Sequence, residues 1–230
     1  MVSYETKYTF IAQQKQMIKD WVEYCCVPDQ QFESGTISSV YYDAPTLNLY
    51  KEKRNGDYIK SKLRLRWYCD LETIDPDTDV NCYLELKRKY GTTRQKERLC
   101  LTLAAKFLAF DLFNNEVITD LPSRADELMY LPTRALKPMA LIQYHRSRYI
   151  DPQSGSRFAI DTGIRCTQVN SDYISVLPPV YLGVGVLEVK GKQTELPASL
   201  KPISAYLTKE AFSKYGQCLE HLMIPLRRRI

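Results

Sequence analysis

Basic side chains recur at every second position along several short stretches of the sequence. One stretch places Lys62, Arg64 and Arg66 in alternation with apolar residues. Residues two apart on a β-strand point to the same side, so such a stretch would carry a row of positive charge on one face. Arginine binds phosphate through paired hydrogen bonds, and lysine binds it as a point charge. The pattern therefore indicates binding of phosphate or a polyphosphate.

Six further stretches share this alternation, and four of them interleave carboxylates with the basic residues. The rows are Glu5 and Lys7; Tyr83, Glu85, Lys87 and Lys89; Lys96 and Arg98; Tyr144, Arg146 and Arg148; Arg157 and Asp161; and Glu188 and Lys190. Basic groups packed together repel one another unless carboxylates or a bound anion compensate them. Two interpretations stay open. The rows either face water on one side of an antiparallel sheet, or line a lumen that a polyanion threads.

The interleaved carboxylates, Glu5, Glu85, Asp161 and Glu188, also allow two interpretations. As structural groups they would balance basic residues through cross-strand pairs. As functional groups, one or two of them would hold Mg²⁺ or Mn²⁺, which prefer oxygen ligands and often share the phosphates of a substrate. The chain has two histidines, in separate stretches, so we expect no imidazole-based metal site.

Composition limits the class of protein. The 230 residues carry 32 Lys and Arg against 27 Asp and Glu, a net charge of +5 that permits an anionic partner. No stretch approaches the ~20 apolar residues that cross a bilayer, so we expect no direct membrane insertion. The seven scattered cysteines are expected to be reduced thiols of a cytoplasmic protein. The arginines at 227–229 lack accompanying aromatic residues, so nucleic acid is not an expected partner.

Local patterns predict the elements that position these rows. Alternating apolar residues, many β-branched or aromatic, predict eight strands. They span residues 3–10, 36–43, 62–68, 82–89, 94–102, 139–150, 156–162 and 184–190. Helical spacing predicts helices over 12–24, 198–207 and 209–222, with an irregular helical region at 104–132. No linker or repeat interrupts the pattern, which favours one α+β domain over residues 1–230 built on a closed antiparallel barrel.

A set of motifs in fixed order adds a family resemblance. They are Lys7-Tyr8, Ser39-Val40-Tyr41-Tyr42-Asp43, Lys62-Leu63-Arg64-Leu65-Arg66, Leu84-Glu85-Leu86-Lys87, Tyr144-His145-Arg146, Arg157-Phe158-Ala159-Ile160-Asp161-Thr162, Leu187-Glu188-Val189-Lys190 and Ser213-Lys214-Tyr215. Together they resemble the polyphosphate polymerase domain of the vacuolar transporter chaperone (VTC) family, within the triphosphate tunnel metalloenzymes. Sister hydrolases open with Glu-x-Glu-x-Lys, whereas Ser3 stands at the first position here, a departure that favours the polymerase branch.

The resemblance implies a closed eight-stranded antiparallel β-barrel tunnel, with helices packed outside and a C-terminal helix near one mouth. It implies catalytic phosphate contacts from Arg64, Arg66, Arg146, Arg157 and Lys87. Further phosphate-binding residues would be Lys7, Lys62, Lys96, Tyr144, Lys190, Ser213 and Lys214. The implied metal ligand is Glu188, with Glu85 and Glu5 as additional candidates for Mn²⁺ or Mg²⁺.

The implied activity is a metal-dependent phosphotransferase. It would move the γ-phosphate of a nucleoside triphosphate, ATP in the first instance, onto inorganic phosphate or polyphosphate. Two alternatives stay open. The same walls would serve a tunnel triphosphatase, whose acceptor is water, or a polyanion-binding module without catalysis. The sequence predicts neither the oligomeric state nor the preferred nucleotide.

Overall fold

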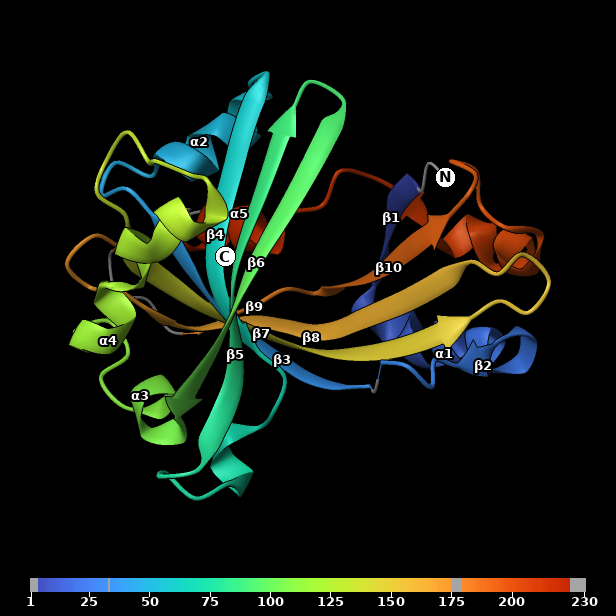
Figure 1. The fold of residues 1–230 in the computed structure, drawn as a ribbon. Coiled ribbons are helices and arrows are strands. Elements are labelled where there is room, and N and C mark those ends of the chain that lie inside the picture. The colour runs from blue at the N-terminus through green and yellow to red at the C-terminus, as the bar shows by residue number, and fades with distance from the viewer. Residues whose placement is uncertain (1–3, 33, 175–178, 224–230) are drawn as a thin grey trace.

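The computed structural model describes residues 4–32, 34–174 and 179–223, and it is built on one large antiparallel sheet (Figure 1). Ser3 and the arginines at 227–229 lie outside the described residues. The eight long strands are β1 (Tyr4–Ile11), β3 (Gly35–Asp43), β4 (Ile59–Trp67), β5 (Asp79–Tyr90), β6 (Thr93–Ala104), β7 (Lys137–Ile150), β8 (Arg157–Val169) and β10 (Val184–Gly191). Three two-residue strands, β2 (Val27–Pro28), β9 (Val180–Tyr181) and β11 (Thr208–Lys209), pair at the margins. The eight predicted strands are thus all present within the described residues.

The strands of the described residues do not close into a hydrogen-bonded barrel. Their order is β11-β1-β10-β8-β7-β3-β4-β5-β6, and among the described residues β6 pairs with neither β1 nor β11. The sheet nevertheless curls strongly, because β7 carries register shifts against both β3 and β8, and bulges increase local twist. Figure 1 shows β4, β5 and β6 standing steeply across the direction of β7, β8 and β10. The predicted closed barrel is therefore not confirmed at the level of strand pairing.

Helices cover the outer face of both halves of the sheet. Helix α1 (Lys15–Cys25) buries Ile18 and Val22 at helical spacing, together with the 3₁₀ helix η4 (Ala198–Tyr206), against an apolar cluster from β1, β8 and β10. The outer faces of β4 and β5 bury Leu63, Leu65 and Leu84 under α3 (Ala105–Ala109), α4 (Glu116–Thr119) and the 3₁₀ helix η3 (Leu121–Leu128). Burial of these alternating apolar residues leaves the charged rows on the opposite face.

Helix α5 (Lys214–Met223) packs on the charged side of the sheet. It buries Leu219 and Leu222 in a cluster with Tyr41, Ile142 and Val186. Ile142 is two residues from Tyr144, and Val186 is two residues from Glu188, so the helix shares a face with the charged rows. The N-terminus of α5 therefore lies beside the basic residues, as expected for a C-terminal helix near one end of the site.

Helix boundaries differ from the predictions in two places. Helix α2 (Asn48–Asn55) was not predicted from its polar sequence. Its start is fixed by Asp43, whose carboxylate accepts hydrogen bonds from the backbone N–H groups of Leu49 and Tyr50, both at 2.9 Å. The predicted helix over 209–222 begins at Lys214 instead, because residues 208–209 pair with β1. The short 3₁₀ helices η1 (Ala12–Gln14) and η2 (Leu71–Thr73) complete the elements. Within the described parts of the chain, no helix has the length and apolar character needed to cross a membrane.

Candidate functional site

One half of the basic face centres on a single buried carboxylate. Glu85 on β5 accepts hydrogen bonds from Nε and Nη2 of Arg64, at 2.9 and 2.7 Å, through Oε2. Its Oε1 lies 2.7 Å from Lys96 Nζ and 2.8 Å from Arg98 Nη2, and Arg66 Nη1 lies 3.5 Å from Oε2. Burial favours the neutral acid, but Arg64 and Arg66 outweigh it and hold the pKa of Glu85 far below its usual range. We call this group the Glu85 cluster.

The other half centres on a fully buried aspartate. Arg146 donates from Nε and Nη2 to the two oxygens of Asp161, with Nη2 at 2.6 Å from Oδ2, and Lys214 Nζ also pairs with Asp161. Arg146 reaches Glu188 as well, at 2.9 Å, and Lys7 Nζ lies 3.2 Å from the other Glu188 oxygen. Despite burial, Arg146 and Lys7 keep the pKa of Glu188 well below normal. These five residues form the Asp161 cluster.

Tyr144 connects the two clusters, and Tyr41 lies beside the Glu85 cluster. Arg66 Nη2 donates to the hydroxyl of Tyr144 at 3.2 Å, and Lys214 Nζ lies 4.5 Å from the centre of the Tyr144 ring. Arg64 Nη1 donates to the hydroxyl of Tyr41 at 3.1 Å. The hydroxyl oxygens of Tyr41 and Tyr144 each accept a hydrogen bond from an arginine, so their O–H protons remain available to donate to a bound anion. The buried Tyr41 has a lowered pKa because Arg64 and Arg66 outweigh the effect of burial.

The N-terminus of α5 contributes a further positive region. Ser213 accepts a hydrogen bond from the backbone N–H of Gly216 at 3.2 Å, the geometry of a helix N-cap. Lys62 Nζ donates to the same Ser213 oxygen at 2.7 Å. Burial, together with Lys7 and Lys53, holds the pKa of Lys62 well below its usual value. A lysine pressed among like charges at a positive helix end is a position that a bound anion would stabilise.

Replacing Lys62 with methionine is expected to stabilise the ligand-free protein. The change removes a like charge from a crowded basic region while keeping most of the side-chain volume, so the free energy of unfolding should rise by about 1 kcal/mol. Thermal unfolding with and without tripolyphosphate measures the effect, and the same variant should bind tripolyphosphate more weakly. Lys51→Met, on the exposed side of α2, is the control. A lower melting temperature for Lys62→Met alone would show that Lys62 is a structural residue.

A looser group joins the two ends of the curled sheet. Lys87 Nζ on β5 lies 3.6 Å from Oε2 of Glu5 on β1, and Lys7 Nζ lies 3.8 Å from Oε1 of Glu5. Burial and the nearby Arg64 lower the pKa of Lys87 to about 8 even though Glu5 opposes them. Lys190 stands opposite Glu5 in the β1–β10 register and is exposed. Strands β1 and β5, which do not pair with each other, are thus joined by a side-chain contact on the basic face.

Arg157 is placed apart from both clusters. Its Nη2 donates to Oε1 of Gln31 at 2.6 Å, and its Nε lies 3.7 Å from Asp29. Arg157 is the first residue of β8, four residues from Asp161, which corresponds to about 13 Å along a strand. It shares the predicted face with Asp161 but lies at the edge of the site, where it holds the loop before β3.

The carboxylates differ in how well they fit a divalent metal. Among the described residues, no group of three or more His, Cys, Asp or Glu is arranged to hold an ion. Both Glu85 and Glu188 pair with cations through both oxygens, but Glu85 has three cations within 2.8 Å, whereas the contacts of Glu188 are at 2.9, 3.2 and 3.8 Å. Glu85 is therefore the poorer candidate ligand. Glu188 lies close enough to Glu5 that burial and the charge of Glu188 both oppose the lowering of the Glu5 pKa by Lys87. This pair suits Mg²⁺ or Mn²⁺ only if substrate phosphates supply the remaining ligands, as they commonly do.

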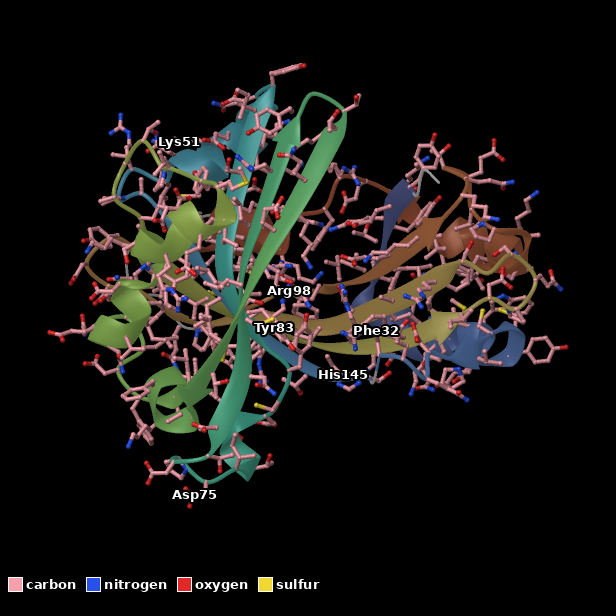
Figure 2. All side chains as sticks on the ribbon, in the orientation of Figure 1. Phe32, Lys51, Asp75, Tyr83, Arg98 and His145 are labelled. Atoms are coloured by element: carbon pink, nitrogen blue, oxygen red, sulfur yellow. The ribbon has the colours of Figure 1, made fainter. Side chains whose placement is uncertain are left out.

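The structure adds residues to which the family resemblance assigned no site role. Asp161 organises one cluster, Arg98 completes the other, and Tyr41 and Ser39 bind Arg64 and Arg66. Arg98 and Tyr83 lie on the side of the β5–β6 hairpin that faces β7 and β8 (Figure 2). The alternation along β3 and β6 carried the signal for Tyr41 and Arg98, since both fall on the charged side of their strands.

Several solved structures are similar to this chain at low sequence identity. Two bacterial proteins solved under the description "putative adenylate cyclase" have similar folds. One, from Vibrio parahaemolyticus, is 11% identical with a TM-score of 0.48 and covers 94% of this chain and 98% of its own. The other, from Bacillus halodurans, is 14% identical with a TM-score of 0.44 and covers 98% and 93%. A chain of the Schizosaccharomyces pombe Mediator head module is 12% identical, with a TM-score of 0.43 and coverage of 90% of each chain.

No match was found among curated protein sequences. A family model described as the VTC domain matches residues 2–223. That range includes both charged clusters, the Lys62–Ser213 contact and α5. The match over nearly the whole length shows that the chain belongs to the VTC domain family.

Proposed function

We propose that the protein is a polyphosphate polymerase that transfers the γ-phosphate of ATP to inorganic phosphate or a growing polyphosphate chain. The observation that supports this most is a charge imbalance on the basic face. Among the described residues, eight basic side chains pair there with only four carboxylates, and the amine of Lys62 lies beside them. A polyphosphate would supply the missing negative charge, with one charge or more on each phosphate.

Phosphoryl transfer asks mainly for positioning and charge neutralisation. In this proposal Arg64, Arg66 and Arg146 bind non-bridging oxygens of the triphosphate, and Lys87 and Lys214 neutralise the transferred group. An oxygen of inorganic phosphate or of the terminal phosphate of the polymer attacks the γ-phosphorus in line. The bond from that phosphorus to the β,γ-bridging oxygen breaks, and ADP leaves with the electron pair. No side chain acts as a nucleophile.

A divalent cation belongs to this proposal, as it does to other enzymes that transfer phosphoryl groups. Glu188, assisted by Glu5, would hold Mn²⁺ or Mg²⁺ together with phosphate oxygens. The ion would neutralise charge on the β- and γ-phosphates during transfer. Glu85 is left out of the metal-binding group, because Arg64, Lys96 and Arg98 already surround it.

The two alternative functions, a triphosphatase and a binding module, would use the same basic residues but give different products. A triphosphatase would use water as the acceptor and release free phosphate. A binding module would hold ATP or polyphosphate unchanged. Purified protein incubated with ATP, phosphate and Mn²⁺ or Mg²⁺ distinguishes the three through a polyphosphate-stained gel beside a free-phosphate assay. We expect a metal-dependent ladder. Free phosphate without a ladder would indicate hydrolysis, and bound but unchanged ATP would indicate the binding module.

Phosphate binding is expected to weaken as the pH rises through 8. The pKa of Lys87 is about 8 in the ligand-free protein, so its positive charge is largely present at pH 7 and largely lost at pH 9. A Lys87→Arg variant keeps its charge throughout this range. Tripolyphosphate affinity measured from pH 7 to 9 should therefore fall more steeply for the wild type than for the variant. Parallel curves for the two proteins would show that Lys87 does not contact the phosphates.

A further inference from the structure

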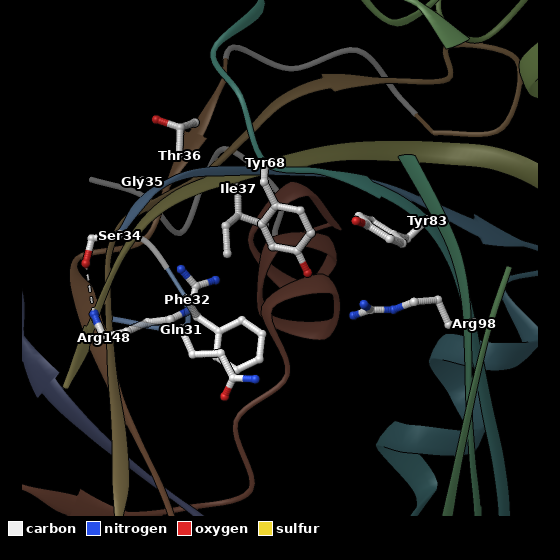
Figure 3. A pocket seen from close by; sticks show the side chains of 10 residues that line it. All are labelled: Gln31, Phe32, Ser34, Gly35, Thr36, Ile37, Tyr68, Tyr83, Arg98 and Arg148. Carbon is white, nitrogen blue, oxygen red and sulfur yellow. Dashed lines mark hydrogen bonds between the residues drawn. The ribbon is translucent and has the colours of Figure 1, made fainter. Parts of the chain in front are cut away.

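A cavity rich in aromatic rings opens at one end of the basic face. It has a volume of about 310 Å³ and lies between the start of β3, the C-terminal end of β4 and the first half of β5 (Figure 3). Phe32, Tyr68 and Tyr83 supply its rings, and Arg98 and Arg148 supply two guanidinium groups. In the view of Figure 3, Tyr83 and Arg98 lie on one side and Arg148 on the other, with Tyr68 and Phe32 drawn between them. The mechanism proposed above uses none of the three rings.

The walls of this cavity are suited to a flat aromatic ligand. The Tyr68 and Tyr83 rings lie 5.7 Å apart at an interplanar angle of 70°, an edge-to-face contact rather than a parallel stack. The guanidinium carbon of Arg98 lies 4.5 Å from the centre of the Tyr83 ring, and that of Arg148 lies 5.9 Å from the Tyr68 ring. Aromatic rings and arginine planes are the groups on which nucleobases stack. Tyr68 and Phe32 remain 40% and 47% exposed, which leaves ring surface for a ligand to cover.

The loop that carries Phe32 is held in place at this end of the site. Arg157 lies with its guanidinium carbon 5.3 Å from the centre of the Phe32 ring, and it also binds Gln31. The backbone N–H of Asp29 donates to the carbonyl of Arg148 at 3.0 Å. The position of Arg157 thus gives it a part in shaping the cavity, a role separate from the phosphate clusters.

The spacing from this cavity to the clusters matches the length of a nucleotide. Tyr68 is two residues from Arg66 and four from Arg64, and Tyr83 is two residues from Glu85. These separations correspond to about 7 and 13 Å along extended strands. A base stacked in the cavity would therefore extend its phosphates along the rows from Arg66 towards Arg64 and Lys87.

We propose that this cavity binds the base of the nucleoside triphosphate and so fixes the end of the basic face at which the nucleotide enters. The inference rests on the proposed function, in which a nucleotide is the phosphate donor. A volume of 310 Å³ lies at the small end of ligand pockets and suits a ring system with its sugar. The growing polymer then leaves from the opposite end, past Lys62 and Lys87. Because every base has a ring face that can stack, the cavity does not select one base over another.

The test compares a ligand that has a base with one that lacks it. Calorimetry measures the affinity of ATP and of tripolyphosphate in EDTA, where no turnover occurs, for the wild type and for Tyr83→Leu and Tyr68→Leu. Both leucine variants should bind ATP about tenfold more weakly, as expected for the loss of one stacking partner, and tripolyphosphate within twofold of the wild type. Tyr83→Phe and Tyr68→Phe keep the ring and should bind both ligands normally. Tyr24→Leu, on the exposed side of α1, is the surface control.

The two proposals fail in different ways. Equal losses for ATP and tripolyphosphate, or unchanged ATP binding in both leucine variants, would overturn the base site. Selective loss of ATP binding in a protein whose wild type makes no polymer would support the base site and remove the polymerase. Using two tyrosines keeps the result interpretable if the Tyr83→Leu variant does not fold, since the exposed Tyr68 contributes little to the core.

Discussion

Replacing Arg66 with alanine is expected to reduce polyphosphate synthesis from ATP by about two to three orders of magnitude. Arg66 donates from Nε to Ser39 at 3.1 Å and from Nη2 to Tyr144 at 3.2 Å, which aims its guanidinium between the two clusters. Glu85 keeps Arg64, Lys96 and Arg98 in the variant, so charge balance around it survives. A gel assay for polymer, with circular dichroism to follow folding, measures the loss.

Two further variants make the Arg66 result specific. Arg66→Lys keeps the charge but loses the planar pair of donors, so it should retain a small part of the activity. Arg124→Ala removes an arginine that pairs with Glu127 on the surface of η3, and it should leave synthesis unchanged. Normal synthesis by a folded Arg66→Ala protein would exclude Arg66 from the phosphate-binding site, and Arg146 would be the next arginine to test.

The eight long strands could be predicted from the sequence because burial imposes a period of two on each. Leu63 and Leu65 face the outer core while Arg64 and Arg66 face the opposite side, so local alternation carries the signal. Closure could not be predicted in the same way. Whether β6 pairs with β1 depends on accumulated twist and on register shifts in β7, neither of which has a local sequence pattern. Helix α2 was missed because its start is fixed by Asp43, through tertiary hydrogen bonds.

The rows of the site were predictable, but their partners were not. Register decides that Arg64 and Arg98 both stand opposite Glu85, and no spacing within one strand contains that information. The contact between Lys62 and Ser213 joins residues 151 positions apart. Arg157 shows the opposite error, since sharing a face with Asp161 does not place it at the same depth along the strand. Alternation predicts on which face of the sheet a side chain lies, but it does not predict how far along the strand from the site that side chain is.

Replacing Glu85 with glutamine is expected to lower the free energy of unfolding at pH 7 by about 3–5 kcal/mol, the usual cost of breaking a buried ion pair. Glutamine keeps the shape and one acceptor but leaves four cations without their shared charge. The folded state holds the pKa of Glu85 far below its unfolded value. The contribution of the carboxylate is therefore complete above the unfolded pKa and is lost as the pH falls towards the folded one. The difference between wild type and variant, measured by urea unfolding, should stay constant from pH 6 to 8 and narrow in acid.

Ligand binding in the same variant tests what the buried carboxylate does in the free protein. If phosphates use Arg64, Lys96 and Arg98, then Glu85 neutralises those cations until a polyanion arrives. Tripolyphosphate should then raise the melting temperature of Glu85→Gln more than that of the wild type, because the variant has more uncompensated charge to offer. Glu97→Gln, on the opposite face of β6, should respond like the wild type. Equal stabilisation of all three proteins would mean that Glu85 and the phosphates do not share cations. The Glu85 cluster would then be a structural ion pair network, and the Asp161 cluster with Lys62 would remain as the phosphate site.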